Sequence, residues 1–194
     1  MLRLLALVIA AACCAAGQEQ PRPAPIPSDV VTYLDTSGKE HPSADFENLR
    51  GLVLFFLAID CPISNGYVPE IRRIYEKYSK LGVKFYAVQS DPAKDAAASA
   101  KFVADYKLPF PMLLDPTHSL ASELEASITP EVALIAPTGE VQYLGRIDNL
   151  YVQIGQKRYA ATEFDLRNAL DAALAAKPIR VNRTKAVGCS IPKN

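Results

Sequence analysis

Cys61 is the residue of this sequence best placed for covalent chemistry, because it stands between an apolar run at 52–58 and a segment with helical periodicity. The N-terminal end of a helix favours a thiolate through its unpaired N–H groups and its dipole, and only the thiolate is nucleophilic. Pro62 suits the first helical position, which needs no N–H. A local dithiol motif would have a second cysteine at position 64, where this chain has Ser64. Cys61 is therefore a reactive thiol without a local partner or, alternatively, an inert core cysteine.

The residues next to Cys61 give conflicting evidence on whether it is reactive. Asp60 places a carboxylate beside the thiol, and this disfavours the thiolate unless Asp60 points away or caps the helix. The five residues at 62–66, Pro-Ile-Ser-Asn-Gly, are typical of an open turn rather than of a core segment. On balance the sequence favours a reactive Cys61.

The first 17 residues have the composition of an export signal, with one basic residue, an apolar core and a run of small residues before Gln18. The next segment, 18–28, is polar and rich in proline, which predicts an extended tether. We therefore expect a periplasmic or secreted protein. Lipid attachment at Cys13 or Cys14 is the alternative.

Cys189 is the candidate partner of Cys61, because removal of the signal or anchoring would leave these two cysteines of the four in the chain. Two cysteines in an exported, oxidising setting commonly pair, although their spacing alone does not establish a bond. Gly188 gives the backbone latitude to bring the sulfur close. A redox couple, a permanent disulfide that pins the tail, and two unpaired thiols all remain open.

Composition narrows the class of protein. A chain of 194 residues with 49% hydrophobic and 22% charged content predicts one globular domain, and 21 basic residues balance 21 acidic ones. We therefore expect no nucleic-acid partner. The two histidines, His41 and His118, form no ligand motif with the cysteines, and His118 has the context of a solvated helix start. We expect no metal and no cofactor.

The elements that must position Cys61 follow from the apolar periodicity, which predicts an α/β chain in the order β-α-β-α-β-α-β-β-α. A hairpin is expected first, turning at Ser37 and Gly38. Asp91 is expected near the start of the second helix, Gly82 ends the first helix, and Thr162 or a neighbour caps the last one. The expected strands lie at 52–58, 83–90, 110–115, 131–136 and 140–148, and the expected helices at 67–81, 92–106, 119–126 and 161–176.

Three segments resemble the thioredoxin superfamily, in its redoxin or peroxiredoxin-like branch of the alkyl hydroperoxide reductase and thiol-specific antioxidant type. They are "DCPISNGYVPEI", "ITPEVALIAPTGEVQYLGRID" and "VGCSIPK". The resemblance covers roughly residues 29 to 192. It implies a thioredoxin-like fold over 29–178, a central mixed sheet flanked by helices, and a C-terminal tail, 179–194, carrying Cys189. It also implies that Cys61 is the reactive residue and that Thr129 and Pro130 form a cis-proline loop that contacts substrate.

Departures from the family pattern limit the chemistry that the resemblance implies. A peroxidatic cysteine has proline seven residues before it and threonine three before it, where this chain has Leu54 and Ala58. Efficient peroxidase activity is therefore not expected. Arg146 and Asp148 match the family pattern, and a surface ion pair is their simplest interpretation. Tyr67 either shapes the site or packs in the core, and the segment 149–161 is long enough to be a lid or binding loop.

The sequence thus predicts an exported thiol–disulfide oxidoreductase with Cys61 as nucleophile and Cys189 as resolving cysteine. Its partners would be a protein or small-molecule disulfide or peroxide and a thiol electron donor. One alternative is a weak thiol peroxidase. A second is a non-enzymatic module with a structural disulfide that binds an extended peptide beside Thr129 and Pro130.

Overall fold

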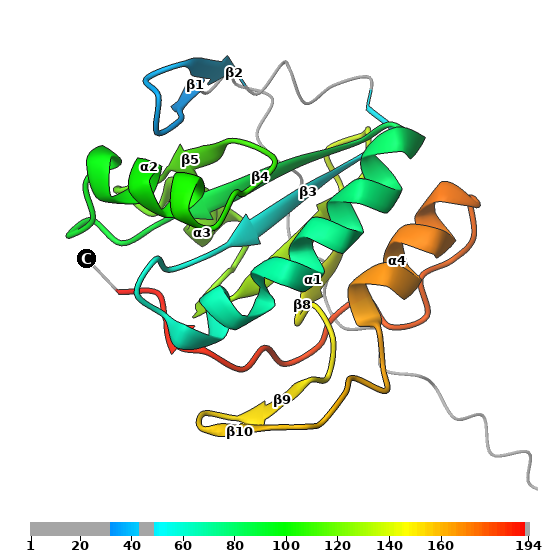
Figure 1. Ribbon diagram of the computed structural model, residues 1–194. Coiled ribbons are helices and arrows are strands. Elements are labelled where there is room, and N and C mark those ends of the chain that lie inside the picture. Colours follow the sequence, from blue (N-terminus) through cyan, green and yellow to red (C-terminus); the bar gives the residue numbers. More distant parts are fainter. Residues whose placement is uncertain (1–31, 43–48, 193–194) are drawn as a thin grey trace, which may run out of the picture.

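A five-stranded mixed sheet forms the centre of the protein, whose computed structural model describes residues 32–42 and 49–192 (Figure 1). The strands run in the order β5-β4-β3-β7-β8, with β3, β4 and β5 parallel and with β7 antiparallel to both of its neighbours. This confirms the predicted α/β class and its mixed sheet. The strand bounds are β3 Gly51–Phe56, β4 Val83–Gln89, β5 Met112–Leu114, β7 Glu131–Ile135 and β8 Val141–Gly145.

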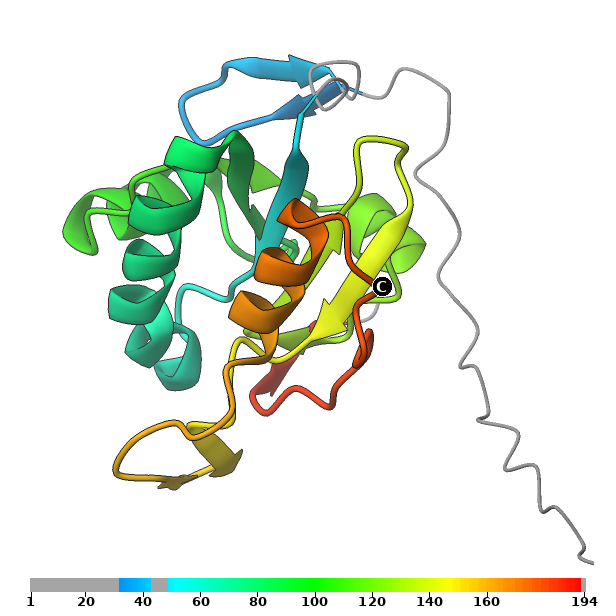
Figure 2. The same cartoon turned by 90° about the vertical axis from the view of Figure 1, so that its right-hand side faces the viewer.

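The central strand β3 is buried along its whole length, because helices cover both faces of the sheet. Val53 and Phe55 belong to the core cluster on the side of α1 (Pro62–Tyr78), α2 (Ala96–Asp105) and α4 (Asp165–Leu174). Leu52 and Leu54 belong to the opposite cluster, with the short helix α3 (Ser119–Glu123). Figures 1 and 2 show α1 and α4 side by side on one face of the sheet.

In the described ranges, three two-stranded pairings lie outside the central sheet. β1 (Thr32–Leu34) and β2 (Glu40–Pro42) form the expected antiparallel hairpin, and Gly38 turns it with a φ of 81°. β9 (Tyr151–Gln153) and β10 (Gln156–Lys157) form a second hairpin inside the segment predicted as a lid or binding loop. β6 (Ile128–Thr129) pairs with β11 (Cys189–Ser190). The signal and tether predicted for 1–28 lie outside the described residues.

Three predicted helix starts are wrong. α1 begins at Pro62, so the residues expected as an open turn are helical, and Ile63 and Ser64 turn inward to the core. Asp95, not Asp91, caps α2, by accepting a hydrogen bond from the Ala98 N–H at 2.7 Å. α4 begins without a side-chain cap, because Thr162 is held outside the helix by Asn149.

The helix stop was predicted correctly. Gly82 follows a short 3₁₀ turn, η2 (Ser79–Leu81), in a left-handed conformation with a φ of 86°. Within the two described ranges, no helix is long and apolar enough to cross a membrane.

Candidate functional site

Cys61 lies at the junction where the chain leaves β3 and enters α1. It is the N-cap residue of α1 in extended conformation, its N–H donates to the carbonyl of Ala58, and its carbonyl accepts from the N–H of Asn65. Pro62 occupies the first helical position, which needs no N–H, so of the two expectations for this residue the helical one is correct and the open turn at 62–66 is not. Cys61 is 1% exposed and belongs to the core cluster on the α1 side. The position of its side chain is therefore restricted by the packing around it.

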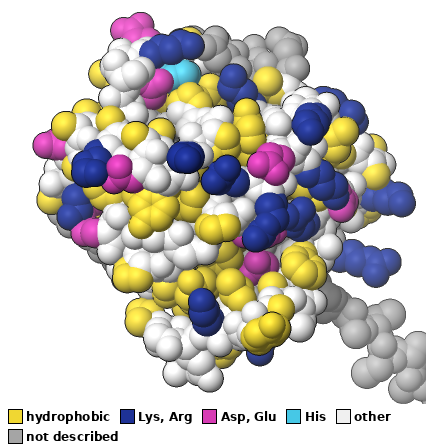
Figure 3. Space-filling view, in the orientation of Figure 1, with side chains coloured by type: hydrophobic (Ala, Val, Ile, Leu, Met, Phe, Trp, Pro, Cys, Tyr) yellow, Lys and Arg dark blue, Asp and Glu magenta, His cyan; other side chains and the backbone are white. Residues whose placement is uncertain are grey.

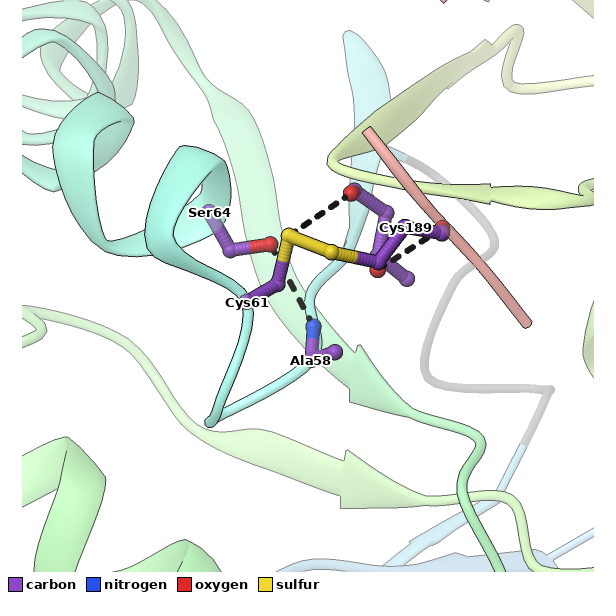
Figure 4. Close-up of a disulfide and its surroundings, with 5 residues drawn as sticks. Ala58, Cys61, Ser64 and Cys189 are labelled. Carbon is purple, nitrogen blue, oxygen red and sulfur yellow. Dashed lines mark hydrogen bonds between the residues drawn. A yellow bond between two sulfur atoms is a disulfide. The ribbon is translucent and has the colours of Figure 1, made fainter. Parts of the chain in front are cut away.

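A disulfide joins Cys61 to Cys189 across 128 positions of the sequence (Figure 4). Their Cα atoms are 6.2 Å apart, a separation that disulfides commonly span. Cys189 reaches Cys61 because β11 pairs antiparallel with β6, with Cys189 opposite Thr129 and Ser190 opposite Ile128. The structure has the two cysteines paired, which agrees with a redox couple and with a permanent disulfide but not with two unpaired thiols.

Thr129 contacts both cysteines. Its carbonyl oxygen lies 3.3 Å from Sγ of Cys61, within reach of a thiol at that position once the disulfide is broken. Its hydroxyl donates to the carbonyl of Cys189 at 3.2 Å. The peptide bond from Thr129 to Pro130 is cis, as the family resemblance implied. The predicted substrate-contacting pair therefore lies directly against the disulfide.

Ser64 and Asp60 each make a polar contact with a group other than the sulfur atoms. Ser64 is fully buried, and its hydroxyl accepts from the N–H of Ala58 at 3.4 Å (Figure 4). The Asp60 carboxylate pairs with Lys94 at 2.7 Å, and the hydrogen bond from Lys94 holds the pKa of Asp60 below its ordinary value. The carboxylate that could have opposed a Cys61 thiolate therefore faces a lysine on the surface.

Tyr67 packs in the core and also carries a buried polar contact. Its hydroxyl donates to Oδ1 of Asp148 at 2.7 Å, and the same oxygen accepts from the N–H of Leu150. Burial raises the pKa of Asp148 above its ordinary value, although the hydrogen bond from Tyr67 opposes this shift. Burial likewise raises the pKa of Tyr67 far above 10.

The surface ion pair suggested for Arg146 and Asp148 is wrong. Arg146 binds the carboxylates of Glu163 and Asp165, the latter at 2.8 Å and in the first turn of α4. The two residues therefore diverge. Arg146 ties the end of β8 to α4, and Asp148 ties the following turn to α1.

Glu131 is a residue of the site that the sequence analysis missed. Its carboxylate is buried and accepts the N–H groups of Ser127 and Ile128, so it holds the loop that carries β6. Burial raises the pKa of Glu131 above its ordinary value. The signal was present in the sequence, because Glu131 is an acidic residue at the start of an otherwise apolar strand and directly follows Pro130.

The two histidines are both buried, which corrects the prediction that His118 is solvated. His41 pairs with Asp35 at 2.8 Å and contacts the hydroxyl of Tyr86, whereas His118 occupies the turn before α3 with a positive φ of 57°. In the part of the chain that the structure describes, no three histidine, cysteine or acidic residues come together as a candidate metal site.

The surface around the site carries mixed charge over α1 and α4 and exposed apolar side chains at the β9–β10 hairpin. Figure 3 shows basic and acidic side chains interspersed over the face that carries α1 and α4. The β9–β10 hairpin exposes Val152, Ile154 and, just beyond it, Tyr159. Tyr151 fixes this hairpin to α1, because its ring lies where a side chain at Gly66 would have to be.

The sequence matches the family model described as AhpC/TSA family over residues 24–144. Thiol-disulfide oxidoreductase ResA of Geobacillus kaustophilus is 28% identical over 118 residues, which cover 61% of this chain and 65% of that protein. The match therefore spans just under two thirds of this relative.

Two solved structures establish the thioredoxin-like fold. A hypothetical protein of Sinorhizobium meliloti 1021 superposes with a TM-score of 0.76 at 23% identity, covering 90% of this chain and 95% of that one. A secreted disulfide oxidoreductase of Mycobacterium tuberculosis, described as homologous to DsbE of E. coli, superposes with a TM-score of 0.53 at 19% identity. This superposition covers 75% of this chain and 95% of the Mycobacterium tuberculosis chain.

Proposed function

Because the chain belongs to the AhpC/TSA family, we propose that it is an exported thiol–disulfide oxidoreductase in which Cys61 is the nucleophile and Cys189 the resolving cysteine. The observation that carries this proposal is the Cys61–Cys189 disulfide at the N-terminus of α1. Similarity to a relative named as a thiol-disulfide oxidoreductase supports the reaction class. The signal-like composition of residues 1–17 supports export.

The proposed reaction is a pair of exchanges. In the reduced protein the Cys61 thiolate attacks one sulfur of a substrate disulfide, so a mixed disulfide forms and one substrate thiolate leaves. The Cys189 thiolate then attacks Sγ of Cys61, closes the intramolecular disulfide and releases the second substrate thiolate. Two electrons pass from the protein to the substrate. A dithiol donor returns them by the same exchanges in reverse.

The surroundings of Cys61 suit this role. The N–H groups of the first turn of α1 stabilise a thiolate at the N-cap position, and the neighbouring Asp60 carboxylate is occupied by Lys94. Substrates would be disulfides of proteins or small molecules, and a thiol donor would supply the electrons. None of these steps requires a metal or an organic cofactor.

A peptide-binding module with a structural disulfide is the second candidate function. Two observations favour it, because Cys61 is almost completely buried and because β11 shows that an extended segment can seat on β6. In that case the disulfide would persist under mild reduction and no covalent intermediate would form.

The test uses the full chain with Cys189→Ser and with Cys61→Ser. Each variant is incubated with oxidised glutathione and with insulin near neutral pH, and adducts are identified by mass spectrometry of tryptic peptides. We expect Cys189→Ser to accumulate mixed disulfides on Cys61, and Cys61→Ser to react much more slowly through Cys189. If Cys189→Ser forms no adduct with either probe, the oxidoreductase proposal is wrong and the peptide-binding module takes its place.

A further inference from the structure

The C-terminal tail lies on β6 in a single defined register. Cys189 is opposite Thr129, and the pairing is extended at one end by a hydrogen bond from the N–H of Ile191 to the carbonyl of Ser127 at 2.9 Å. The Thr129 hydroxyl adds its contact to the carbonyl of Cys189. The tail therefore shows the register that an extended segment takes on β6 when its cysteine is bonded to Cys61.

The residue before the cysteine is constrained in this register by close contact. A Cβ atom added to Gly188 would lie 2.7 Å from the carbonyl carbon of Thr129 and 3.1 Å from Cδ of Pro130, and closer still to the Thr129 carbonyl oxygen. Real Cβ atoms essentially never approach other heavy atoms within 3.0 Å. The backbone of Gly188 is not in the left-handed region, so the need for glycine here is one of space.

The residues that a side chain at position 188 would contact, Thr129 and Pro130, are held in place by their surroundings. Thr129 is 4% exposed, and its carbonyl oxygen also faces Cys61. Pro130 is a buried, rigid ring that leads directly into β7, a strand of the central sheet. Glu131 holds the loop from the other side through the N–H groups of Ser127 and Ile128. A side chain before the cysteine would have to push the whole segment away from β6.

We propose that the edge of β6 beside Cys61 selects extended segments in which glycine immediately precedes the reacting cysteine. The chain's own Gly188-Cys189 is one such segment, and a partner segment would take its place once the tail is released. This selectivity rests on the proposed function, because it requires Cys61 to exchange disulfides. It names the substrate class as Gly-Cys disulfides in extended, accessible stretches of polypeptide.

The test uses the reduced Cys189→Ser chain and synthetic peptides with the tail sequence, AVGCSIPK, each joined by a disulfide to glutathione. The Cys61 thiolate attacks the peptide sulfur, the bond between peptide and glutathione breaks, and the glutathione thiolate leaves, so no further oxidant is needed. The comparison peptides are AVACSIPK, in which alanine replaces the glycine, and AVGCAIPK, in which alanine replaces the serine at the exposed Ser190 position. Rates are followed by mass spectrometry.

We expect AVACSIPK to form the Cys61 adduct about tenfold more slowly than AVGCSIPK, since crowding a methyl group against fixed atoms costs on that scale. AVGCAIPK should match AVGCSIPK, and reaction with free cysteine corrects for the intrinsic reactivity of each peptide. Equal rates for the glycine and alanine peptides would overturn the selectivity while leaving the oxidoreductase function intact. Absence of any reaction, also with oxidised glutathione, would overturn the proposed function itself.

A second arm of the experiment keeps the tail in place. In the full chain, Gly188→Ala should lower the equilibrium constant for closing the Cys61–Cys189 bond against a glutathione buffer by about tenfold, and Ser190→Ala should leave it unchanged. Far-ultraviolet circular dichroism of the reduced variants verifies that the fold is retained. An unchanged constant in Gly188→Ala would contradict the steric argument independently of the peptide rates.

Discussion

The hydroxyl of Tyr67 donates a hydrogen bond of 2.7 Å to Oδ1 of Asp148, and so joins α1 to the turn that follows β8. Both residues are less than 5% exposed. A carboxylate buried to this degree is costly unless donors compensate for its lost hydration. Tyr67 and the N–H of Leu150 are the donors that the structure provides.

The pH dependence of stability should reflect this carboxylate. Because burial raises the pKa of Asp148 in the folded state, its contribution is most favourable below the ordinary pKa, near 4. That contribution is lost as the pH rises through the raised folded value. Asp148→Asn should therefore flatten the curve of unfolding free energy against pH from about 4 upward. Urea unfolding of both proteins across this range measures the effect.

Tyr67→Phe provides the control in the opposite direction. It keeps the ring in the core but removes the hydrogen bond that opposes the rise in the Asp148 pKa. The stability loss should then extend to higher pH than in the unchanged protein. An identical pH curve for Tyr67→Phe would mean that the hydroxyl contributes nothing to the ionisation of Asp148.

The disulfide should also contribute strongly to stability. It closes a loop of 128 positions, and the chain-entropy model assigns such a loop about 5 kcal/mol of unfolding free energy. Reduction should lower the urea midpoint of the unchanged protein towards that of Cys189→Ser, whose own midpoint should not respond to reductant. A loss below about 1 kcal/mol would show that the unfolded chain is not restrained as this model requires.

Sequence patterns predicted the sheet well because its strands are continuous apolar runs covered on both faces. They predicted the start of α1 poorly, because Pro-Ile-Ser-Asn-Gly is favourable both for a turn and for a first helical turn, and burial of Ile63 and Ser64 decides between them. The pairing of Cys189 with Cys61 depends on the register of β11 on β6. Two-residue strands have too little periodicity to reveal such a register in a sequence.

The reason for Gly188 likewise became visible only in space. From the sequence, the expectation was backbone freedom, as glycine provides in tails and turns. In the structure, the decisive factor is the carbonyl of Thr129, a residue 59 positions earlier whose approach no local pattern encodes. The same holds for Arg146, whose partners Glu163 and Asp165 are brought to it by the packing of α4.

Reaction with peroxide should be slow. Leu54 is fully buried within β3, and Ala58 follows the strand without a side-chain hydroxyl, so neither residue can polarise a peroxide at Cys61. Stopped-flow mixing of the reduced protein with hydrogen peroxide should give a rate constant close to that of an ordinary cysteine thiolate. Oxidation several orders of magnitude faster would show that other groups of the site activate the peroxide, and would favour the thiol peroxidase alternative.

The last prediction concerns Ser64, which occupies the position of the second cysteine in a local dithiol motif. Ser64 lies three residues after Cys61 in the first turns of α1, where residues at this spacing are neighbours on the helix surface. Its hydroxyl makes one long contact, 3.4 Å to the N–H of Ala58, so replacement by a thiol of similar shape should be tolerated.

In the Cys189→Ser background, a mixed disulfide between Cys61 and glutathione should persist, because no second thiol of the folded domain can attack it. Adding Ser64→Cys should release the glutathione, since the new thiolate can attack Sγ of Cys61 and close a local disulfide. Mass spectrometry over time measures the adduct, and Ser64→Ala in the same background is the matched control that should leave it in place. If the adduct outlasts the introduction of Ser64→Cys, the helix holds position 64 turned away from Cys61. Release of a substrate from Cys61 would then depend on the distant Cys189.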